Sequence, residues 1–467
     1  MKPEIKPTPL TVVGAGPAGI MAARAAANAG VVVTVIDENP RPGGQYYRQS
    51  PAEFELSDPV AAHSGHPEAA GLYASLDHPN IHVIQQMEVW GVFDQRTLAL
   101  TDHKQTFLLE TDRLVLATGA YDRPLAFPGW TLPGVFGAGA ALRMLKTQWM
   151  SPGKRVLLAG LGPLQLSLAD LLLKSGVEVV CVAEAVNLFS AWRYLPGLWG
   201  HWNRLSEAYG YHRTLRKHRV PLLFNHAIIS AEGSGQVEKA TIARLDKDGA
   251  AIPGTMKTFE VDTVCMGYGL LPSYQLPTAV GCELRYDSKL RWFVPRHDDN
   301  METSEAGVFV AGDVTDMGGA YVAAAEGRVA GLIAARQLGK LTSGALQPAR
   351  AELRRLNRLA SALQGIYAMR PGLAHLSHDD TFICRCEEIT AGEIKNSLSN
   401  GAIDLHQVKL QTRCGMGYCQ GRMCNVLTAP IIAGQTGRPL SAMKPYTARP
   451  PVQPISLGEL AAGNGVT

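Results

Sequence analysis

The chain has 467 residues, of which 46% are hydrophobic and 18% are charged, and its formal net charge is +3. This length allows two to four domains, each with its own core. The small and dispersed charge excludes the electrostatic footprint of a nucleic-acid-binding protein. No apolar run approaches the roughly 20 residues of a membrane-spanning helix, and 48 glycines are typical of a soluble α/β protein with many tight turns.

The N-terminal segment predicts a dinucleotide-binding unit. Residues 10–13 are apolar, and residues 14–19 read Gly-Ala-Gly-Pro-Ala-Gly. An alanine-rich segment that predicts a helix then extends to Ala29, and a β-branched run over residues 31–36 ends at Asp37. This order of strand, glycine turn, helix, strand and acid is the full context in which the glycine fingerprint becomes informative.

Each part of this motif has a chemical role. We expect Gly14 to form the tight turn, Gly16 to let the backbone approach a pyrophosphate, and Gly19 to let the helix pack closely on the strand. The N–H groups at the start of the helix would hold the anion. Asp37 would accept hydrogen bonds from the adenosine ribose, and Glu38 would do so if the strand ends one residue later.

Three further segments indicate which cofactor is bound. Gly43-Gly44-Gln45 permits a close turn of the backbone, Leu114 to Gly119 predicts a buried strand ending in Ala-Thr-Gly, and Gly307 to Asp313 predicts a strand that delivers a carboxylate after a glycine. Together with the fingerprint they resemble the two-dinucleotide-domain flavoprotein family over about residues 8 to 340. The resemblance implies FAD, with the family's ribityl-binding aspartate at Asp313, although an ordinary surface turn is the alternative there. The further cofactor-binding residues that it implies are Gly44, Gln45, Thr118, Gly119 and Gly312.

A second unit of the same kind follows in altered form. Residues 155–160 and 177–182 predict strands, and Gly160-Leu-Gly162-Pro-Leu-Gln165 opens a helix between them. In the resembled family this unit binds NAD(P)H. Here Gln165 replaces the third glycine, and its side chain would separate helix from strand or crowd a phosphate. We therefore doubt a standard nicotinamide site and keep another nucleotide or a structural role as alternatives.

The cysteines outside the C-terminal region argue against disulfide reductase chemistry. Cys181, Cys265 and Cys282 are isolated, and none belongs to a Cys-x-x-Cys pair. We expect them to be small buried hydrophobic residues. The densest aromatic stretch, from Phe189 to Trp202, predicts either packing of the second unit or a partner surface.

Five of the eight cysteines cluster near the C-terminus. They occur as Cys384-Arg-Cys386 and as Cys414, Cys419 and Cys424. Clustered thiolates are soft ligands that suit iron-sulfur clusters or zinc. A disulfide framework is disfavoured because the chain starts with no signal segment, so a reduced, intracellular metal site is expected.

The spacing of these cysteines resembles the bacterioferritin-associated-ferredoxin-like [2Fe-2S] domain, which has Cys-x-Cys, about thirty residues, and then a second pair. The predicted ligands are Cys384, Cys386, Cys419 and Cys424, and Cys414 is a substitute ligand. Zinc is the alternative, but the single residue inside the first pair is tighter than usual zinc spacing.

The fold class that follows is α/β, a two-dinucleotide-binding-domain flavoprotein with an inserted second domain and a small C-terminal [2Fe-2S] domain. The proline-rich tail would be either a loose end or an arm on a partner. The predicted parts are an FAD domain at 1–150 with 255–340, an inserted domain at 151–254, a helical linker at 341–375, a cluster domain at 376–435 and a tail at 436–467.

Nearly the whole chain resembles the A (alpha) subunit of bacterial multi-subunit amine and amino-acid dehydrogenases, the group of opine oxidases, hydroxyproline and proline dehydrogenases and hydrogen cyanide synthase. Residues 37–45, the segment Thr131-Leu-Pro-Gly-Val-Phe-Gly and the segment Gly415-Met-Gly-Tyr-Cys-Gln-Gly-Arg carry this match. The resemblance implies that a separate beta subunit with its own FAD oxidises a C–N bond. This chain would pass the electrons through its FAD and cluster to a quinone or another acceptor.

The same resemblance implies further partners. Relatives allow an FMN at a subunit interface, for which the sequence has no motif, and a small third subunit. We expect a cytoplasmic protein that reaches the inner membrane only through partners. The alternatives are a self-sufficient NAD(P)H-dependent flavoprotein reductase with a fused iron-sulfur domain and a regulatory redox sensor.

Overall fold

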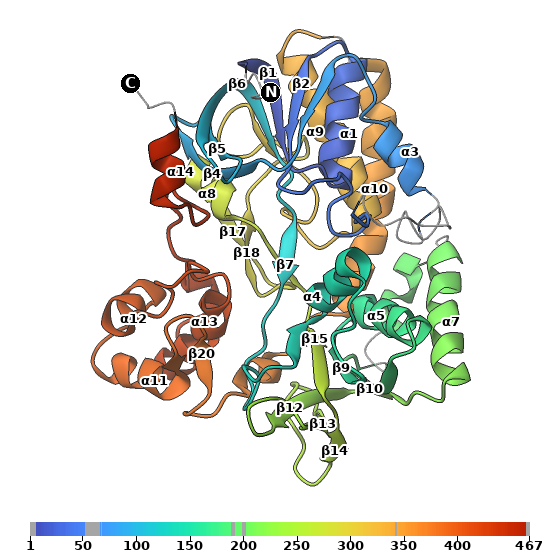
Figure 1. The fold of residues 1–467 in the computed structure, drawn as a ribbon, viewed down its shortest axis with the longest axis vertical. Helices are drawn as coiled ribbons and strands as arrows, with labels where there is room; N and C mark the ends of the chain where they lie inside the picture. The colour runs from blue at the N-terminus through green and yellow to red at the C-terminus, as the bar shows by residue number, and fades with distance from the viewer. Residues whose placement is uncertain are drawn as a thin grey trace.

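The computed structural model describes residues 6–51, 66, 68–187, 192–198, 202–340 and 343–463. A mixed sheet and a parallel sheet form the centre of the molecule, and a small helical domain lies beside them (Figure 1). Within these described residues, no helix is both long enough and apolar enough to cross a membrane.

The first sheet has the strand order β3-β2-β1-β6-β5-β4, and β19 pairs with the second half of β6. In its parallel part β2 is buried along its whole length and β1 is buried from Leu10 onward, as expected for strands covered on both faces. Its strands are β1 (Thr8–Val13), β2 (Val33–Ile36), β3 (Ile81–Ile84), β4 (Glu88–Phe93), β5 (Thr97–Thr101), β6 (Thr106–Leu116) and β19 (Val308–Val310).

Helices α1 (Pro17–Asn28) and α9 (Ala320–Gln337) cross closely on one face of this sheet (Figure 1). A Cβ at Gly327 would lie 1.9 Å from the carbonyl oxygen of Ala18, and one at Gly331 would lie 2.1 Å from that of Ala22. Two glycines one turn apart therefore permit the close helix crossing that fixes the start of α1. The short helix α3 (Ala69–Ala74) lies beside α1.

The second sheet has the order β11-β10-β9-β15-β8, with every pair parallel. Both β8 and β15 lie outside 151–254, so this unit is larger than the predicted insertion at both ends. Its strands are β8 (Val135–Gly137), β9 (Arg155–Gly160), β10 (Glu178–Glu184), β11 (Leu222–Phe224) and β15 (Thr263–Gly267), and its helices are α4 (Ala138–Arg143), the π-helix η1 (Met144–Gln148), α5 (Pro163–Lys174), η2 (Trp192–Leu198) and α7 (Trp202–Lys217).

Smaller elements connect these sheets. An antiparallel sheet extends from the second unit at the bottom of Figure 1, and two antiparallel pairs of strands lie between the units. They are β12 (His226–Glu232), β13 (Lys239–Arg244) and β14 (Lys257–Glu260), the pair β7 (Ala120–Asp122) and β16 (Leu270–Pro272), the helix α8 (Gln275–Val280), and the pair β17 (Leu284–Asp287) and β18 (Trp292–Pro295).

The predicted linker is largely helical. Helix α10 (Ser343–Ile366) has an apolar face of Leu346, Ala349 and Leu353 that packs into the core beside α9. Pro348 has no N–H, so the carbonyl of Gly344 loses its hydrogen bond within the helix. Gly344 is exposed, so water can replace that bond and the proline is tolerated near the start of the helix.

The C-terminal domain is small and helical, and it carries all five clustered cysteines. Helix α11 begins with a capping box in which Thr390 and Glu393 satisfy each other's backbone N–H groups. Its elements are η3 (Pro371–His375), β20 (Phe382–Cys384), β21 (Ile389–Thr390), α11 (Ala391–Ser399), α12 (Leu405–Thr412), α13 (Cys424–Thr436) and η4 (Leu440–Ala442).

The tail differs from both expectations for it. After η4 it returns to the first sheet, where the N–H of Val452 donates to the carbonyl of Trp90 at 2.7 Å. Helix α14 (Leu457–Ala462) then lies beside the sheet (Figure 1), and Glu459 accepts a hydrogen bond from Thr101 at 2.8 Å. The tail is therefore an arm on the chain's own first domain.

Candidate functional site

The first glycine loop is shaped by close backbone contacts. Gly14 has φ +104°, and a Cβ there would lie 2.4 Å from the carbonyl oxygen of Ala117. A Cβ at Gly19 would lie 1.7 Å from the carbonyl oxygen of Gly14. Both positions require glycine for the protein's own packing, as the motif predicted.

Gly16 is different, because the protein itself leaves room at this residue. Its φ is −77°, and the nearest atom to an added Cβ is the Cα of Gly44, at 3.7 Å. A Cβ on Gly44, by contrast, would lie 2.9 Å from the Cα of Gly16. Two backbone segments without side chains thus meet at the start of α1, which has no side-chain cap. This bare backbone cradle fits a pyrophosphate.

Asp37 lies directly after β2 and supports the glycine loop. Its Oδ2 accepts a hydrogen bond from the N–H of Ala15 at 2.5 Å, and its Oδ1 accepts one from the N–H of Asn39 at 2.7 Å. Asp37 is buried, whereas Glu38 is exposed. The carboxylate of Asp37 therefore holds the loop, and the carboxylate of Glu38 is the one that projects into solvent beside it.

Gln45, Thr118 and Gly119 join the first sheet to the next segment of chain. Gln45 donates from Nε2 to the carbonyl of Ala120 at 2.6 Å, and Thr118 donates from Oγ1 to the carbonyl of Ser273 at 3.0 Å. Gly119 has φ +67°, which favours glycine at this turn. These contacts bring the predicted Ala-Thr-Gly turn against Gly43-Gly44-Gln45.

A buried acid supports the Gly312-Asp313 turn, and no sequence motif pointed to it. Glu326 of α9 accepts hydrogen bonds from the N–H of Gly312 at 2.7 Å and from the hydroxyl of Thr315 at 3.0 Å. Burial raises the pKa of Glu326 well above its usual range. Burial also raises the pKa of Asp313 to about 6, against the opposing effect of a hydrogen bond from the N–H of Gly319.

The second glycine loop is covered by side chains of the same chain. Glu184, at the end of β10, accepts from the N–H of Gly162 through both carboxylate oxygens, at 3.3 and 3.2 Å. An added Cβ on Gly162 would lie 3.7 Å from the ring of Tyr367, which comes from the linker after α10. Burial raises the pKa of Glu184 to about 8.

Gln165 lies between helix and strands rather than at the loop surface. It is fully buried, its Nε2 donates to the carbonyl of Ala159 at 3.3 Å, and its Oε1 has no partner among the described residues. Added Cβ atoms on Gly160 and Gly267 would lie 2.4 and 2.1 Å from its Nε2. The sequence predicted that Gln165 either separates helix from strand or crowds a phosphate. In the structure its side chain lies between helix and strands, which corresponds to the first of these effects.

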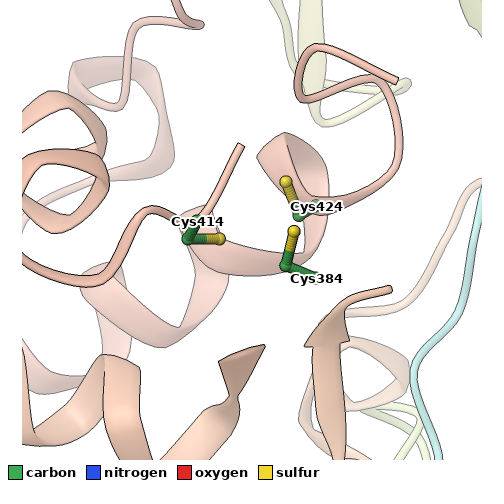
Figure 2. Close-up of side chains that lie close together, drawn as sticks. All are labelled: Cys384, Cys414 and Cys424. Carbon is green, nitrogen blue, oxygen red and sulfur yellow. The ribbon is translucent and has the colours of Figure 1, made fainter. Parts of the chain in front are cut away.

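Three of the five clustered cysteines bring their sulfurs together. The Sγ atoms of Cys384, Cys414 and Cys424 all lie within 4.8 Å of one another, and all three residues are buried. Figure 2 shows these side chains converging from β20, from the loop after α12 and from the start of α13. Two of them are predicted ligands, and the third, Cys414, is the residue that spacing had assigned as a substitute.

The other two predicted ligands, Cys386 and Cys419, lie next to each other at the surface of the same site. Cys386 is exposed and Cys419 is half-buried. Burial raises the pKa of Cys386, and the neighbouring thiols of Cys419 and Cys384 raise it further. A Cβ on Gly417 would lie 2.2 Å from the Cβ of Cys386, so this glycine keeps the loop close to the first pair.

The three inward thiols behave as one coupled group. Hydrogen bonds from Cys414 and Cys424 lower the pKa of Cys384 to about 2, and the same contact with Cys384 raises the pKa of Cys414 to about 11. Hydrogen bonding to Cys384 also raises the pKa of Cys424. Buried, converging sulfurs of this kind are a donor set that a thiophilic metal or an iron-sulfur cluster fits.

The cysteine domain contacts the first domain directly. Asn425, which follows Cys424, donates to the hydroxyl of Tyr274 at 3.0 Å in a buried contact. Burial, together with the nearby Cys419, raises the pKa of Tyr121 in β7 to about 12. The segment after the Ala-Thr-Gly turn thus runs from the cofactor cradle to the cysteine site.

Two further predictions concern residues outside these sites. Cys181, Cys265 and Cys282 are buried and free, as expected of small hydrophobic residues. Within the aromatic stretch 189–202, residues 189–191 and 199–201 lie outside the described residues, and the described Trp192 is 64% exposed.

Two family models match the chain. Pyridine nucleotide-disulphide oxidoreductase matches residues 8–327, and the sarcosine oxidase A3 domain matches residues 378–464. The boundary between the two matches lies near the end of the helical linker.

Curated relatives cover almost the whole chain. The opine oxidase A subunit of Agrobacterium tumefaciens (strain Ach5) is 34% identical over 97% of this chain and 91% of the relative. Hydrogen cyanide synthase subunit HcnB of Pseudomonas protegens is 32% identical over 94% of this chain and 97% of the relative. Among solved structures, L-proline dehydrogenase from P. horikoshii has the same fold, with a TM-score of 0.70 and 21% identity over 98% of this chain and 81% of that one.

Proposed function

The chain belongs to the pyridine nucleotide-disulphide oxidoreductase family and, over almost its entire length, to the family of opine oxidase A subunits; from this premise we propose that it is the electron-transfer subunit of a multi-subunit amino-acid or opine dehydrogenase. It is an oxidoreductase that acts on C–N bonds together with other subunits. A partner subunit with its own FAD carries the substrate site, and a quinone or another acceptor receives the electrons.

FAD occupies the first nucleotide fold in this proposal. The bare backbone of Gly16 and Gly44 receives the pyrophosphate, Glu38 faces the adenosine ribose, and Asp313 faces the ribityl chain. Asp37 and Glu326 do not touch the cofactor but hold the two turns that do, through the N–H groups of Ala15 and Gly312.

The cysteine site holds a [2Fe-2S] cluster in this proposal. Cys384 and Cys424 are common to the predicted pairs and to the converging sulfurs, and the remaining ligands come from Cys386, Cys414 and Cys419. When bound, FAD supplies two-electron chemistry with single-electron release, and the cluster carries one electron at a time. The protein contributes a dry sulfur pocket and fixed contacts between the two cofactor regions.

The observation that carries the proposal is the joining of the cradle to the cysteine site. Asn425 and Tyr274 form a buried hydrogen bond one residue from Cys424, and Tyr274 follows Ser273, whose carbonyl accepts from Thr118 of the Ala-Thr-Gly turn. Electron transfer between a flavin and a cluster needs the two groups close together, and this buried contact between the two domains supports such an arrangement.

A self-sufficient NAD(P)H reductase is less well supported. Its nicotinamide site would be the second glycine loop, where Glu184 already accepts from the N–H of Gly162 and Tyr367 packs on the same residue. The two functions make opposite predictions for the isolated chain, since the reductase oxidises NADH with a dye as acceptor and the electron-transfer subunit does not.

The test is to coexpress the chain with a flavoprotein subunit encoded beside it and to measure dye reduction by amino acids and opines. We expect activity from the complex and none from either protein by itself. Anaerobically prepared protein should contain iron and sulfide and show a [2Fe-2S] paramagnetic signal after reduction. Zinc in place of iron, or brisk NADH oxidation by the chain alone, would contradict the proposal.

Cysteine variants sharpen the ligand assignment. Cys384→Ser is expected to abolish the paramagnetic signal, because the open iron site that it leaves is exposed to hydrolysis. Cys181→Ser removes a buried free thiol elsewhere and is the matched control that keeps the signal. Cys414→Ser and Cys419→Ser then distinguish the two ligand assignments. Loss of the signal in Cys414→Ser supports the set of converging sulfurs, and loss in Cys419→Ser supports the set predicted from the spacing.

A further inference from the structure

A cavity lies where the first domain, the linker and the cysteine domain meet. Its volume is about 30 Å³, which is room for about two water molecules or for one small ionic group. It is lined by Arg123 and Arg291 from the first domain, by Met369 and Leu373 from the linker region and by Ile383 from the cysteine domain, among other residues. None of the described residues that line it is acidic.

Arg123 is the first unusual feature of this cavity. It is only 4% exposed, and its Nη2 donates to the carbonyl of Leu290 at 2.5 Å. Burial lowers the pKa of Arg123 to about 10, and Arg291 lowers it further, while only the hydroxyls of Tyr121 and Tyr286 act in the opposite sense. A buried guanidinium without a carboxylate partner is an uncompensated charge.

Arg291 is the second unusual feature. It has φ +53°, a left-handed conformation that glycine or asparagine adopts at much lower cost. It ends the turn between β17 and β18, where a small residue would serve the hairpin equally well. Arg291 contributes a second positive charge to the lining of the cavity.

An unpaired donor completes the arrangement. Trp292 also lines the cavity, is buried, and has an indole N–H without a hydrogen-bond partner among the described residues. Two guanidinium groups and a free N–H around one small cavity form a donor set for an oxyanion, since planar guanidinium groups match carboxylate and phosphate oxygens.

We propose that the cavity between Arg123, Arg291 and Trp292 binds a small oxyanion, a carboxylate or phosphate group, that joins the cysteine domain to the first domain. The ligand neutralises the buried guanidinium and bridges walls contributed by three parts of the chain. It lies at a place distinct from the glycine loops and from the cysteines. Its binding therefore stabilises the docked arrangement of the domains.

The experiment measures thermal unfolding of the full chain with increasing sodium phosphate or sodium acetate, with sodium chloride keeping the ionic strength constant. We expect a saturable rise in Tm of roughly 2–10 °C with at least one of the two oxyanions. Saturation by phosphate alone identifies a phosphate group, by acetate alone a carboxylate, and by both a general oxyanion site. No saturable rise with either oxyanion, or an equal rise in chloride alone, would overturn the proposal.

Two variants and a control test the residues. Arg123→Gln removes the buried charge but could impair folding, so Arg291→Gly is the main variant: it relieves the left-handed strain and should fold well while losing the oxyanion-dependent rise in Tm. Arg296→Gln is the control, because Arg296 follows the same strand, is exposed, and pairs with Glu283 at 2.8 Å. The same saturable rise in Arg291→Gly as in the wild type would overturn the assignment.

Discussion

The two nucleotide-type folds of this chain have the same order of strand, glycine turn, helix and strand but differ in what lies on the turn. In the first, Asp37 reaches the N–H of Ala15 and leaves Gly16 bare. In the second, Glu184 is one methylene longer and reaches the N–H of Gly162, which corresponds to Gly16. Tyr367 then packs on that glycine from outside the unit.

This difference teaches that a glycine fingerprint defines a backbone shape and does not by itself define a binding site. The availability of the critical N–H depends on the length of the acid at the end of the second strand and on which distant segment covers the loop. The first fold keeps its cradle open, whereas in the second fold Glu184 and Tyr367 of the linker after α10 cover the corresponding glycine.

The largest expected effect separates the two glycine loops. Gly16→Val should lower the flavin content of purified protein more than about tenfold, because the branched side chain occupies the space where the backbone approaches the pyrophosphate. The fold should survive, since an added Cβ meets nothing nearer than 3.7 Å in the protein. Visible absorbance and circular dichroism measure the two outcomes.

The matched change in the second fold is Gly162→Ala, which should leave the flavin content unchanged. Its Cβ would meet the ring of Tyr367 at 3.7 Å, an ordinary contact distance, but Gly162 has φ +100°, so alanine is strained there and should lower the stability without lowering the flavin content. If Gly16→Val kept its flavin while Gly162→Ala lost it, the assignment of open and closed folds would be reversed.

A second prediction concerns the pH dependence that Glu184 confers. Burial raises its pKa from 4.5 to about 8 in the folded protein. Between these values the unfolded chain loses the proton while the folded chain keeps it, so this group lowers the stability of the wild type progressively as pH rises from about 4.5 to about 8. Glu184→Gln should match the wild type near pH 5 to within about 1 kcal/mol and exceed it near pH 8.5 by about 2–4 kcal/mol.

Urea unfolding of both proteins across this pH range measures the difference. Parallel stability curves for the wild type and Glu184→Gln would show that the acid is not buried against Gly162 as described. Glu178→Gln, a change in the exposed residue at the start of the same strand, serves as the control.

The smallest expected effect is at Gln165. Gln165→Ala should lower the free energy of unfolding by about 1–3 kcal/mol, because it leaves a cavity between α5 and the sheet. Gln165→Leu keeps most of the volume and removes the unpartnered Oε1, so it should lie within about 1 kcal/mol of the wild type. Neither variant should bind NADH in calorimetry, since Glu184 still occupies the N–H of Gly162. Tight NADH binding by Gln165→Leu would make Gln165 itself the block.

Local patterns were sufficient to predict both nucleotide folds. Strand β9 has the predicted bounds, and the glycines at 14 and 19 have the backbone contacts that the motif implies. Such features depend on neighbouring residues in the sequence, where turn geometry and apolar periodicity act directly.

Features that depend on distant segments could not be predicted in this way. Spacing from Cys386 favoured Cys419 over Cys414, but which thiol points inward depends on how α12 and α13 pack. Glu326 reaches Gly312 only because α9 crosses α1 closely, and Tyr367 reaches Gly162 only because α10 ends there.

The C-terminal tail covers one side of the cysteine site. The ring of Tyr446 fills the space beside Gly415 and Gly421, and its hydroxyl donates to the carbonyl of Cys414 at 3.0 Å. This segment is synthesised after all five clustered cysteines, and Val452 fixes it to the first domain only when it has left the ribosome. The side of the cysteine site that Tyr446 covers therefore closes only after all five thiols have been synthesised.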